Sequence, residues 1–207
     1  MTQIFHIHPD NPQQRLLRQA ADILRKGGLI AYPTDTTYAL GCGIGEKAAL
    51  DRLIQLRRLD DKHQFSILCA DLSEIATYAK VRNTDYRLLK AHTPGPYTFI
   101  LQGTSEVPRR LMHEKKRTIG IRVPDHAICQ GLLAELGAPL MTSTLHLPDD
   151  EYPLSDPYDI ENALRGRVDL IIDGGHGGLD ETTVVSLVEE SGPVIVREGA
   201  GAVDRIF

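Results

Sequence analysis

Thr142 and Ser143 are adjacent hydroxyl residues near the end of a short apolar run, residues 139–145. An apolar run that follows a glycine such as Gly137 is typical of a buried strand after a helix. Ligands of open α/β sheets bind where strands end, so these hydroxyls could bind a polar ligand. Alternatively, they cap the turn that follows the strand.

A second set of hydroxyls, Thr34, Thr36 and Thr37, follows an expected strand over residues 29–32. Short polar side chains in this place can hold the amine and carboxylate of a small ligand, or they can stabilise a turn, and the sequence leaves both interpretations open. The glycines of residues 41–45 miss the G-x-G-x-x-G spacing, and no P-loop motif occurs. A Rossmann or P-loop site is therefore excluded.

Arginines stand at the ends of two further elements. Arg57 and Arg58 end an amphipathic helix expected over residues 47–58, and Lys62 follows in a charged segment. Guanidinium groups match the geometry of phosphate, but cations in a last helical turn also stabilise the helix dipole. Arg122 lies on a later expected strand, where the alternation buries Ile121 and Val123 and turns Arg122 to the other face, and there it can bind an anion.

A third group of cations lies in one stretch of the chain. The 23 Lys and Arg stand against 28 Asp and Glu, a formal charge of −5, so a nucleic-acid site must be a local patch. One stretch with five cations could bind the phosphate backbone of RNA, or it could be a solvated hairpin. Its cations are Arg109, Arg110, Lys115, Lys116 and Arg117.

Other combinations of reactive residues favour no further site. His6 and His8 share one face of an expected edge strand without a third ligand nearby, so we expect no metal on protein ligands. His176, near Asp173, could act as a base, but the chain lacks the Gly-x-Ser-x-Gly nucleophile motif of a hydrolase. The cysteines are scattered in apolar sequence, and no apolar run is long enough to span a membrane, so we expect a cytoplasmic protein.

Helices and strands alternate along most of the chain, and strands follow one another closely near its end. With a length of 207 residues, this order predicts a single domain over residues 1–207, of α/β class with a mixed sheet. No strand is expected between residues 33 and 46. Helices are expected over residues 13–26, 47–58, 73–79, 84–92, 125–136 and 156–164, and strands over residues 2–10, 29–32, 65–69, 97–101, 119–123, 139–145, 168–173, 183–188 and 194–197.

Several short motifs, taken in order, resemble the YrdC-like family, and the charged segment after Leu56 with the Pro-Arg-Arg of residues 108–110 resembles its YciO branch. Each motif alone is weak evidence, but their common order over roughly residues 20–200 is specific. The motifs are Pro33 to Gly41, similar to PTDT-x-Y-G-L-G; Pro94 to Thr98, similar to PGP-x-T; Arg122 to Pro124, similar to R-x-P; Thr182 to Val185, similar to ST-V-V; and Arg197 to Ala200, similar to R-x-G-A.

The resemblance implies a YrdC-like twisted open mixed sheet with flanking helices around a concave cavity. Catalytic members of the family join threonine, bicarbonate and ATP, with Mg²⁺, into threonylcarbamoyl-AMP and pyrophosphate, for modification of an adenosine in tRNA. The resemblance thus implies a protein that binds nucleotide, threonine and RNA and, if it is an enzyme, a nucleotidyltransferase of this type. By position in the motifs, Thr34 and Thr36 would face threonine, Arg122 its carboxylate or the phosphates, Thr142 and Ser143 the nucleotide, and Arg197 the far rim of the cavity.

Two departures from the family's motifs count against its reaction. Relatives that carry out the synthesis have Ser-x-Asn where this chain has Ser143 to Leu145, and leucine offers no hydrogen bond to a phosphate. Relatives also have Lys-x-Arg after the helix, where Arg57 and Arg58 leave the register open and neither register supplies both residues. The loss of two charge-assisted contacts would slow the reaction by on the order of hundreds-fold. The alternative is a non-catalytic module that binds tRNA or double-stranded RNA.

Overall fold

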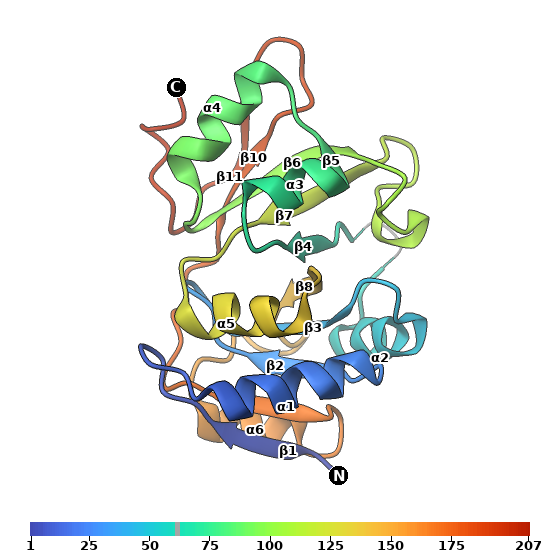
Figure 1. Cartoon of the computed structure of the whole chain (residues 1–207), viewed down its shortest axis with the longest axis vertical. Helices are drawn as coiled ribbons and strands as arrows, with labels where there is room; N and C mark the ends of the chain where they lie inside the picture. The colour runs from blue at the N-terminus through green and yellow to red at the C-terminus, as the bar shows by residue number, and fades with distance from the viewer. Residues whose placement is uncertain (61–62) are drawn as a thin grey trace.

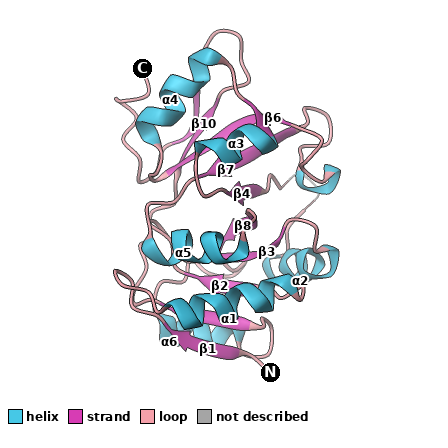
Figure 2. Cartoon of the chain, viewed as in Figure 1, coloured by secondary structure: helices cyan, strands magenta, loops and turns pink. Residues whose placement is uncertain are grey.

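A long twisted sheet with helices on its faces forms the computed structural model, which describes residues 1–60 and 63–207 (Figures 1 and 2). In these residues the sheet has eleven strands in the order β1-β9-β2-β3-β8-β4-β7-β6-β10-β11, with β5 paired to β6 outside this path. Parallel and antiparallel neighbours alternate irregularly along it. The sheet is therefore open and mixed, as the sequence predicted.

Six α-helices and a short 3-10 helix occur in the described part of the chain. The strands are β1 Gln3–His6, β2 Ile30–Tyr32, β3 Ala39–Gly43, β4 Ser66–Leu68, β5 Ala79–Lys80, β6 Tyr97–Gly103, β7 Thr118–Arg122, β8 Leu140–Thr144, β9 Leu170–Asp173, β10 Thr183–Ser186 and β11 Val194–Arg197. The helices are α1 Gln14–Arg25, α2 Lys47–Arg57, α3 Leu72–Tyr78, α4 Asn83–His92, α5 Ala127–Leu136 and α6 Pro157–Leu164, with the 3-10 helix η1 at Arg109–Leu111.

Helices α1 and α5 lie side by side on one face of the sheet (Figure 1). Helix α1 buries Leu17 and Leu24, which lie on the same face of the helix two turns apart. They pack in one cluster with Ile30 of β2. A Cβ on Gly131 would lie 2.5 Å from Leu17 Cδ1, so a glycine in α5 lets the two helices approach closely. Leu140, the first residue of β8, packs in the same cluster as these helices.

The sequence prediction was wrong between residues 33 and 46, because β3 runs there between β2 and β8. Its glycines and small residues have weak strand propensity, and tertiary packing overrides it. Gly41 pairs with Ile30 of β2, and a Cβ on Gly41 would lie 2.8 Å from a ring carbon of Tyr32. Glycine is needed for the close fit of the tyrosine ring. The two-residue strand β5 was also missed.

Candidate functional site

Short side chains that pair across neighbouring strands make the floor of a cavity. Ser66 of β4 lies opposite Thr142 of β8 on one side and Gly120 of β7 on the other. Ile100 of β6 also lies opposite Gly120. A Cβ on Gly120 would lie 2.4 Å from Ser66 Oγ. Because Ser66, Gly120 and Thr142 are small, they leave a hollow of about 360 Å³, within the range of roughly 300–1,000 Å³ that small-molecule sites occupy.

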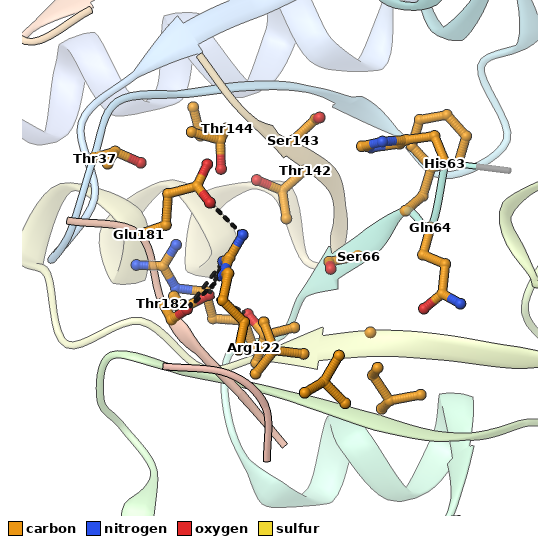
Figure 3. Close-up of a pocket in the computed structure, with 18 of the residues that line it drawn as sticks. Thr37, His63, Gln64, Ser66, Arg122, Thr142, Ser143, Thr144, Glu181 and Thr182 are labelled. Atoms are coloured by element: carbon orange, nitrogen blue, oxygen red, sulfur yellow. Dashed lines mark hydrogen bonds and ion pairs between the residues drawn. The ribbon is translucent and has the colours of Figure 1, made fainter. Parts of the chain in front are cut away.

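Hydroxyl groups surround this cavity on opposite sides. Thr142, Ser143 and Thr144 at the end of β8 face Glu181 and Thr182 across it (Figure 3). The Thr142 hydroxyl lies 2.7 Å from the Tyr32 hydroxyl, whose pKa is raised by burial. The cavity also has an apolar wall, formed by Phe65, Ile100, Val184 and Val196. The structure thus brings Thr142 and Ser143 to the lining of a cavity, as the hypothesis that they bind a ligand requires.

Arg122 projects from the end of β7 into the lining of the cavity and is only 7% exposed. Its Nη2 donates to Thr34 Oγ1 at 3.0 Å and to Thr36 Oγ1 at 2.9 Å, and it forms an ion pair with Asp35. Thr34 and Thr36 therefore hold Arg122 in place and lie outside the lining, whereas Thr37 belongs to it. The Nε of Arg122 is buried and has no hydrogen-bond partner in the described residues, a costly state that a ligand acceptor would relieve.

The structure separates the two arginines at the end of α2. Arg57 lines the cavity, where its Nε donates to the His146 carbonyl at 3.0 Å and its Nη1 donates to the Ser143 hydroxyl. Burial lowers the pKa of Arg57, and the charge of Glu181 acts in the opposite direction. Arg58 is exposed.

The backbone at Arg58 explains this separation. Arg58 ends α2 in the left-handed conformation, with φ 49°, and its side chain reaches Asp149 at 3.3 Å, away from the cavity lining. The structure therefore places Arg57, and not Arg58, in the cavity. Lys62, the third cation predicted here, lies outside the described residues.

Arg197 lines the cavity from β11. Its Nε and Nη2 donate to the Thr182 carbonyl at 3.2 and 2.9 Å, and it forms an ion pair with Glu181. The Thr182 hydroxyl is fixed in turn by the Thr98 hydroxyl at 2.8 Å. The strand-end arginine of the last motif is thus brought to the same cavity as Arg57 and Arg122, although the three lie far apart in the sequence.

His63 is a cavity residue that the sequence did not indicate. Burial, together with the positive charge of Arg57, lowers its pKa to about 4, against opposing effects of Asp60 and Glu181. Its ring meets Phe65 edge-on, with centroids 4.9 Å apart. The imidazole is therefore uncharged at neutral pH, and the cavity's positive charge comes from its arginines.

Leu145 lies in the core and outside the lining of the cavity. The side chain is fully buried, and the backbone N–H donates to the Tyr38 carbonyl at 2.9 Å. Glu181 and Ser66 were missed as cavity residues, whereas Thr37 was among the hydroxyls that the sequence offered for a ligand. Ser66 could have been found from its place at the start of a buried strand, but no sequence signal links Glu181 to residues of β8.

The predicted basic stretch forms an exposed hairpin between β6 and β7, which we call the basic hairpin, residues 104–117. Arg110 forms an ion pair with Asp51, the only ion pair of the hairpin's cations within the described residues. Arg117 closes the turn with φ 53°. All five predicted cations, Arg109, Arg110, Lys115, Lys116 and Arg117, are exposed.

The remaining sequence candidates stay separate from the cavity. Asp173 accepts hydrogen bonds from the Gly175 N–H and contacts His6 at 2.9 Å, so it does not orient His176 as a hydrolase would require. The described residues contain no group of three or more His, Cys, Asp or Glu that could hold a metal ion. Within them, no helix is both long and apolar enough to cross a membrane.

The fold and cavity define a class of protein that comparison with known families identifies. The Sua5–YciO–YrdC family model, described as "Telomere recombination", matches residues 22–199. The chain therefore belongs to this family. It is similar over nearly its whole length to the YciO branch: YciO of Escherichia coli K12 is 55% identical over 203 residues, which cover 98% of both chains. The crystal structure of E. coli YciO has a TM-score of 0.96 over 100% of both chains.

Synthases are more distant relatives. A threonylcarbamoyl-AMP synthase of Xanthomonas oryzae pv. oryzae is 32% identical over 173 residues, 81% of this chain and 90% of the synthase. The crystal structure of P. abyssi Sua5 complexed with L-threonine has a TM-score of 0.90 at 26% identity, over 98% of this chain and 59% of that one. The chain is thus a YciO-like member of the family, distantly related to threonylcarbamoyl-AMP synthases.

Proposed function

We propose that the cavity binds an adenine nucleotide through its phosphate. The convergence of Arg57, Arg122 and Arg197 on one hydroxyl-lined cavity carries this proposal, because forked guanidinium donors match phosphate oxygens and a partly enclosed site strengthens the attraction. The choice of adenine rests on the relatives, which include synthases of an adenylate. The apolar wall that contains Phe65 and Val184 offers a surface for the base.

The remaining roles follow from the geometry of the lining. Arg57 and Ser143, already joined by a hydrogen bond, would hold the phosphate. Arg122, with its unpartnered Nε, would hold a second anionic group, such as the carboxylate of threonine, a ligand that P. abyssi Sua5 binds. Glu181 is the one carboxylate that lines the cavity within the described residues, so Mg²⁺ would enter with ATP and not on a preformed protein site.

If the chain is an enzyme, its reaction would be of the synthase type. Threonine and bicarbonate would form a carbamate with loss of water, and the carbamate oxygen would attack the α-phosphorus of ATP and release pyrophosphate. Such a reaction asks the protein mainly to position the reactants and neutralise charge. The hydroxyls and arginines of the cavity are suited to both tasks.

Binding and turnover test this proposal separately. Calorimetry with AMP and ATP should show binding that Arg122→Ala and Ser143→Ala weaken and that Arg58→Gln leaves unchanged. Pyrophosphate release with ATP, threonine, bicarbonate and Mg²⁺ measures the reaction. If the wild type releases pyrophosphate no faster than the Arg122→Ala and Ser143→Ala variants, the proposed synthase activity is excluded. If the wild type binds no nucleotide, the proposed binding site is excluded.

We propose RNA binding by the basic hairpin as a second function. The observation that favours it is a set of exposed cations, Arg109, Lys115, Lys116 and Arg117, that form no ion pair within the described residues of an otherwise acidic chain. Such cations attract the phosphate backbone of tRNA or double-stranded RNA by charge and shape. Reversal of the charges at Arg109, Arg110, Lys115 and Lys116 should weaken tRNA binding, and unchanged affinity would exclude this role.

A further inference from the structure

Glu181 places a negative charge inside a cavity whose other charged lining residues, within the described part of the chain, are arginines. It lies just before β10, and its carboxylate points into the cavity from the side opposite Thr142 and Ser143 (Figure 3). It forms an ion pair with Arg197, on its own side of the cavity. Its charge also acts on Arg57, which is hydrogen-bonded to Ser143 on the other side. A ligand between the two sides must therefore lie close to this carboxylate.

Two carboxylates neutralise most of the positive charge around the cavity. Asp35 pairs with Arg122, and Glu181 pairs with Arg197. Arg57 forms no ion pair within the described residues and donates to neutral oxygen atoms. Three arginines against two carboxylates leave a formal charge of +1, and the uncharged His63 does not alter it. The cavity thus matches a ligand group that bears a single negative charge.

We propose that Glu181 is a specificity-determining residue that selects a nucleotide whose phosphate bears one negative charge, a phosphodiester or an acyl adenylate, over a free triphosphate. The proposal rests on the proposed function, that the cavity binds a nucleotide. One charge can be met by Arg57 alone. A triphosphate brings several further charges, and like charges a few ångströms from Glu181 repel strongly in a partly enclosed site. Mg²⁺ would relieve this repulsion by neutralising part of the triphosphate.

Calorimetry on the full chain, with EDTA present to remove divalent cations, tests the proposal. The probes are the methyl ester of AMP, whose phosphate carries one charge, and ATP. The wild-type protein should bind the methyl ester more tightly than ATP. Glu181→Gln should tighten ATP binding by about tenfold and change binding of the methyl ester by less than about twofold. The glutamine keeps an acceptor for Arg197, and Glu181→Asp, which keeps the charge, should not tighten ATP binding.

Several results would overturn the proposal. Tighter wild-type binding of ATP than of the methyl ester is one, and it decides the matter even if Glu181→Gln fails to fold, which circular dichroism will show. Unchanged or weakened ATP binding in Glu181→Gln is another, because Glu181 would then be neutral toward the ligand or would hold it. Failure of the proposed function looks different: neither nucleotide would bind to the wild type, and the selectivity proposal would be lost with it.

Discussion

The cavity and the basic hairpin both present arginines, but in opposite physical settings. Arg122 in the cavity is buried, fixed by two threonine hydroxyls and paired with Asp35. Arg109 in the hairpin is exposed and forms no ion pair within the described residues. A buried guanidinium has lost its hydration shell, and its N–H donors point in fixed directions. An exposed guanidinium keeps both its hydration shell and the conformational freedom of its side chain.

This contrast separates two kinds of recognition in one chain. Under the proposed function, the cavity would discriminate between ligands by charge and shape, because its groups are preorganised and weakly screened. The hairpin can attract a polyanion, but salt screens exposed charges over a Debye length of about 10 Å at 0.1 M. Changes to cavity residues should therefore alter stability and specificity, and changes to the hairpin should alter salt-dependent attraction.

The largest effect is expected from Arg122→Met. This substitution leaves Asp35 buried without its cation, and breaking a buried ion pair from one side costs about 3–5 kcal/mol. We expect the free energy of unfolding in urea at neutral pH to fall by about 3 kcal/mol. A loss below about 1 kcal/mol would show that the pair is open to water and that the cavity is not preorganised.

The double variant Asp35→Asn with Arg122→Met is the matched control for this prediction. Asparagine removes the stranded charge, and its amide oxygen can still accept from the Asp125 N–H, which now donates to Asp35 at 3.1 Å. The double variant should therefore recover at least half of the lost stability. Without such a recovery, the loss would come from packing and not from charge.

A smaller effect, on ligand binding, is expected from Arg57→Gln. The variant removes the one cavity arginine without a carboxylate partner in the described residues, so nucleotide affinity should fall by about tenfold or more. Arg58→Gln is the control: Arg58 is exposed and points to Asp149, so affinity should change by less than about twofold. Calorimetry measures the nucleotide affinity of both variants. Equal losses of affinity would contradict the prediction that the cavity arginine, and not the exposed one, binds the ligand.

The same two arginines show what the sequence could and could not predict. The motif order predicted the family, the fold class and the placement of Arg122, Ser143 and Arg197 at strand ends, and strand pairing then brings these ends together. The sequence could not separate Arg57 from Arg58, because that depends on the left-handed backbone at which α2 ends. The backbone conformation of the single residue Arg58 therefore decides which side chain faces the cavity.

Long-range packing accounts for what the sequence missed. The β3 strand was missed because its Gly41 packs against the ring of Tyr32 on the neighbouring strand, a contact that local propensity does not record. Glu181 was missed because it lies in the same cavity as Arg57 only in the folded chain, since the two residues are far apart in the sequence. Leu145 was expected to offer no polar contact to a ligand, and the structure places its side chain in the core, outside the lining, which the sequence did not predict.

His63→Gln should change the pH dependence of stability. The pKa of His63 is about 4 in the folded protein and 6.5 ordinarily, so the unfolded chain binds more protons between these values and stability falls as pH falls through that window. Because His63 is partly exposed, we expect its share of the loss to be about 1 kcal/mol. Urea unfolding at several pH values should show a flatter profile for His63→Gln. His176→Gln, on an exposed loop, should keep the wild-type profile, and identical profiles for all three proteins would contradict the burial of His63.

The smallest effect at physiological salt is expected from neutralising the hairpin, with Arg109, Lys115 and Lys116 changed to glutamine. Each lost phosphate contact should reduce the slope of log affinity against log salt by about 0.7–0.9 for a double-stranded RNA, and affinity itself should fall only about threefold because salt already screens exposed charges. Nucleotide binding in the cavity should not change, since these side chains lie outside its lining. Loss of nucleotide binding in the hairpin variant would show that the cavity and the hairpin do not act independently. An unaltered salt slope for RNA affinity would show that these cations do not contact the phosphates.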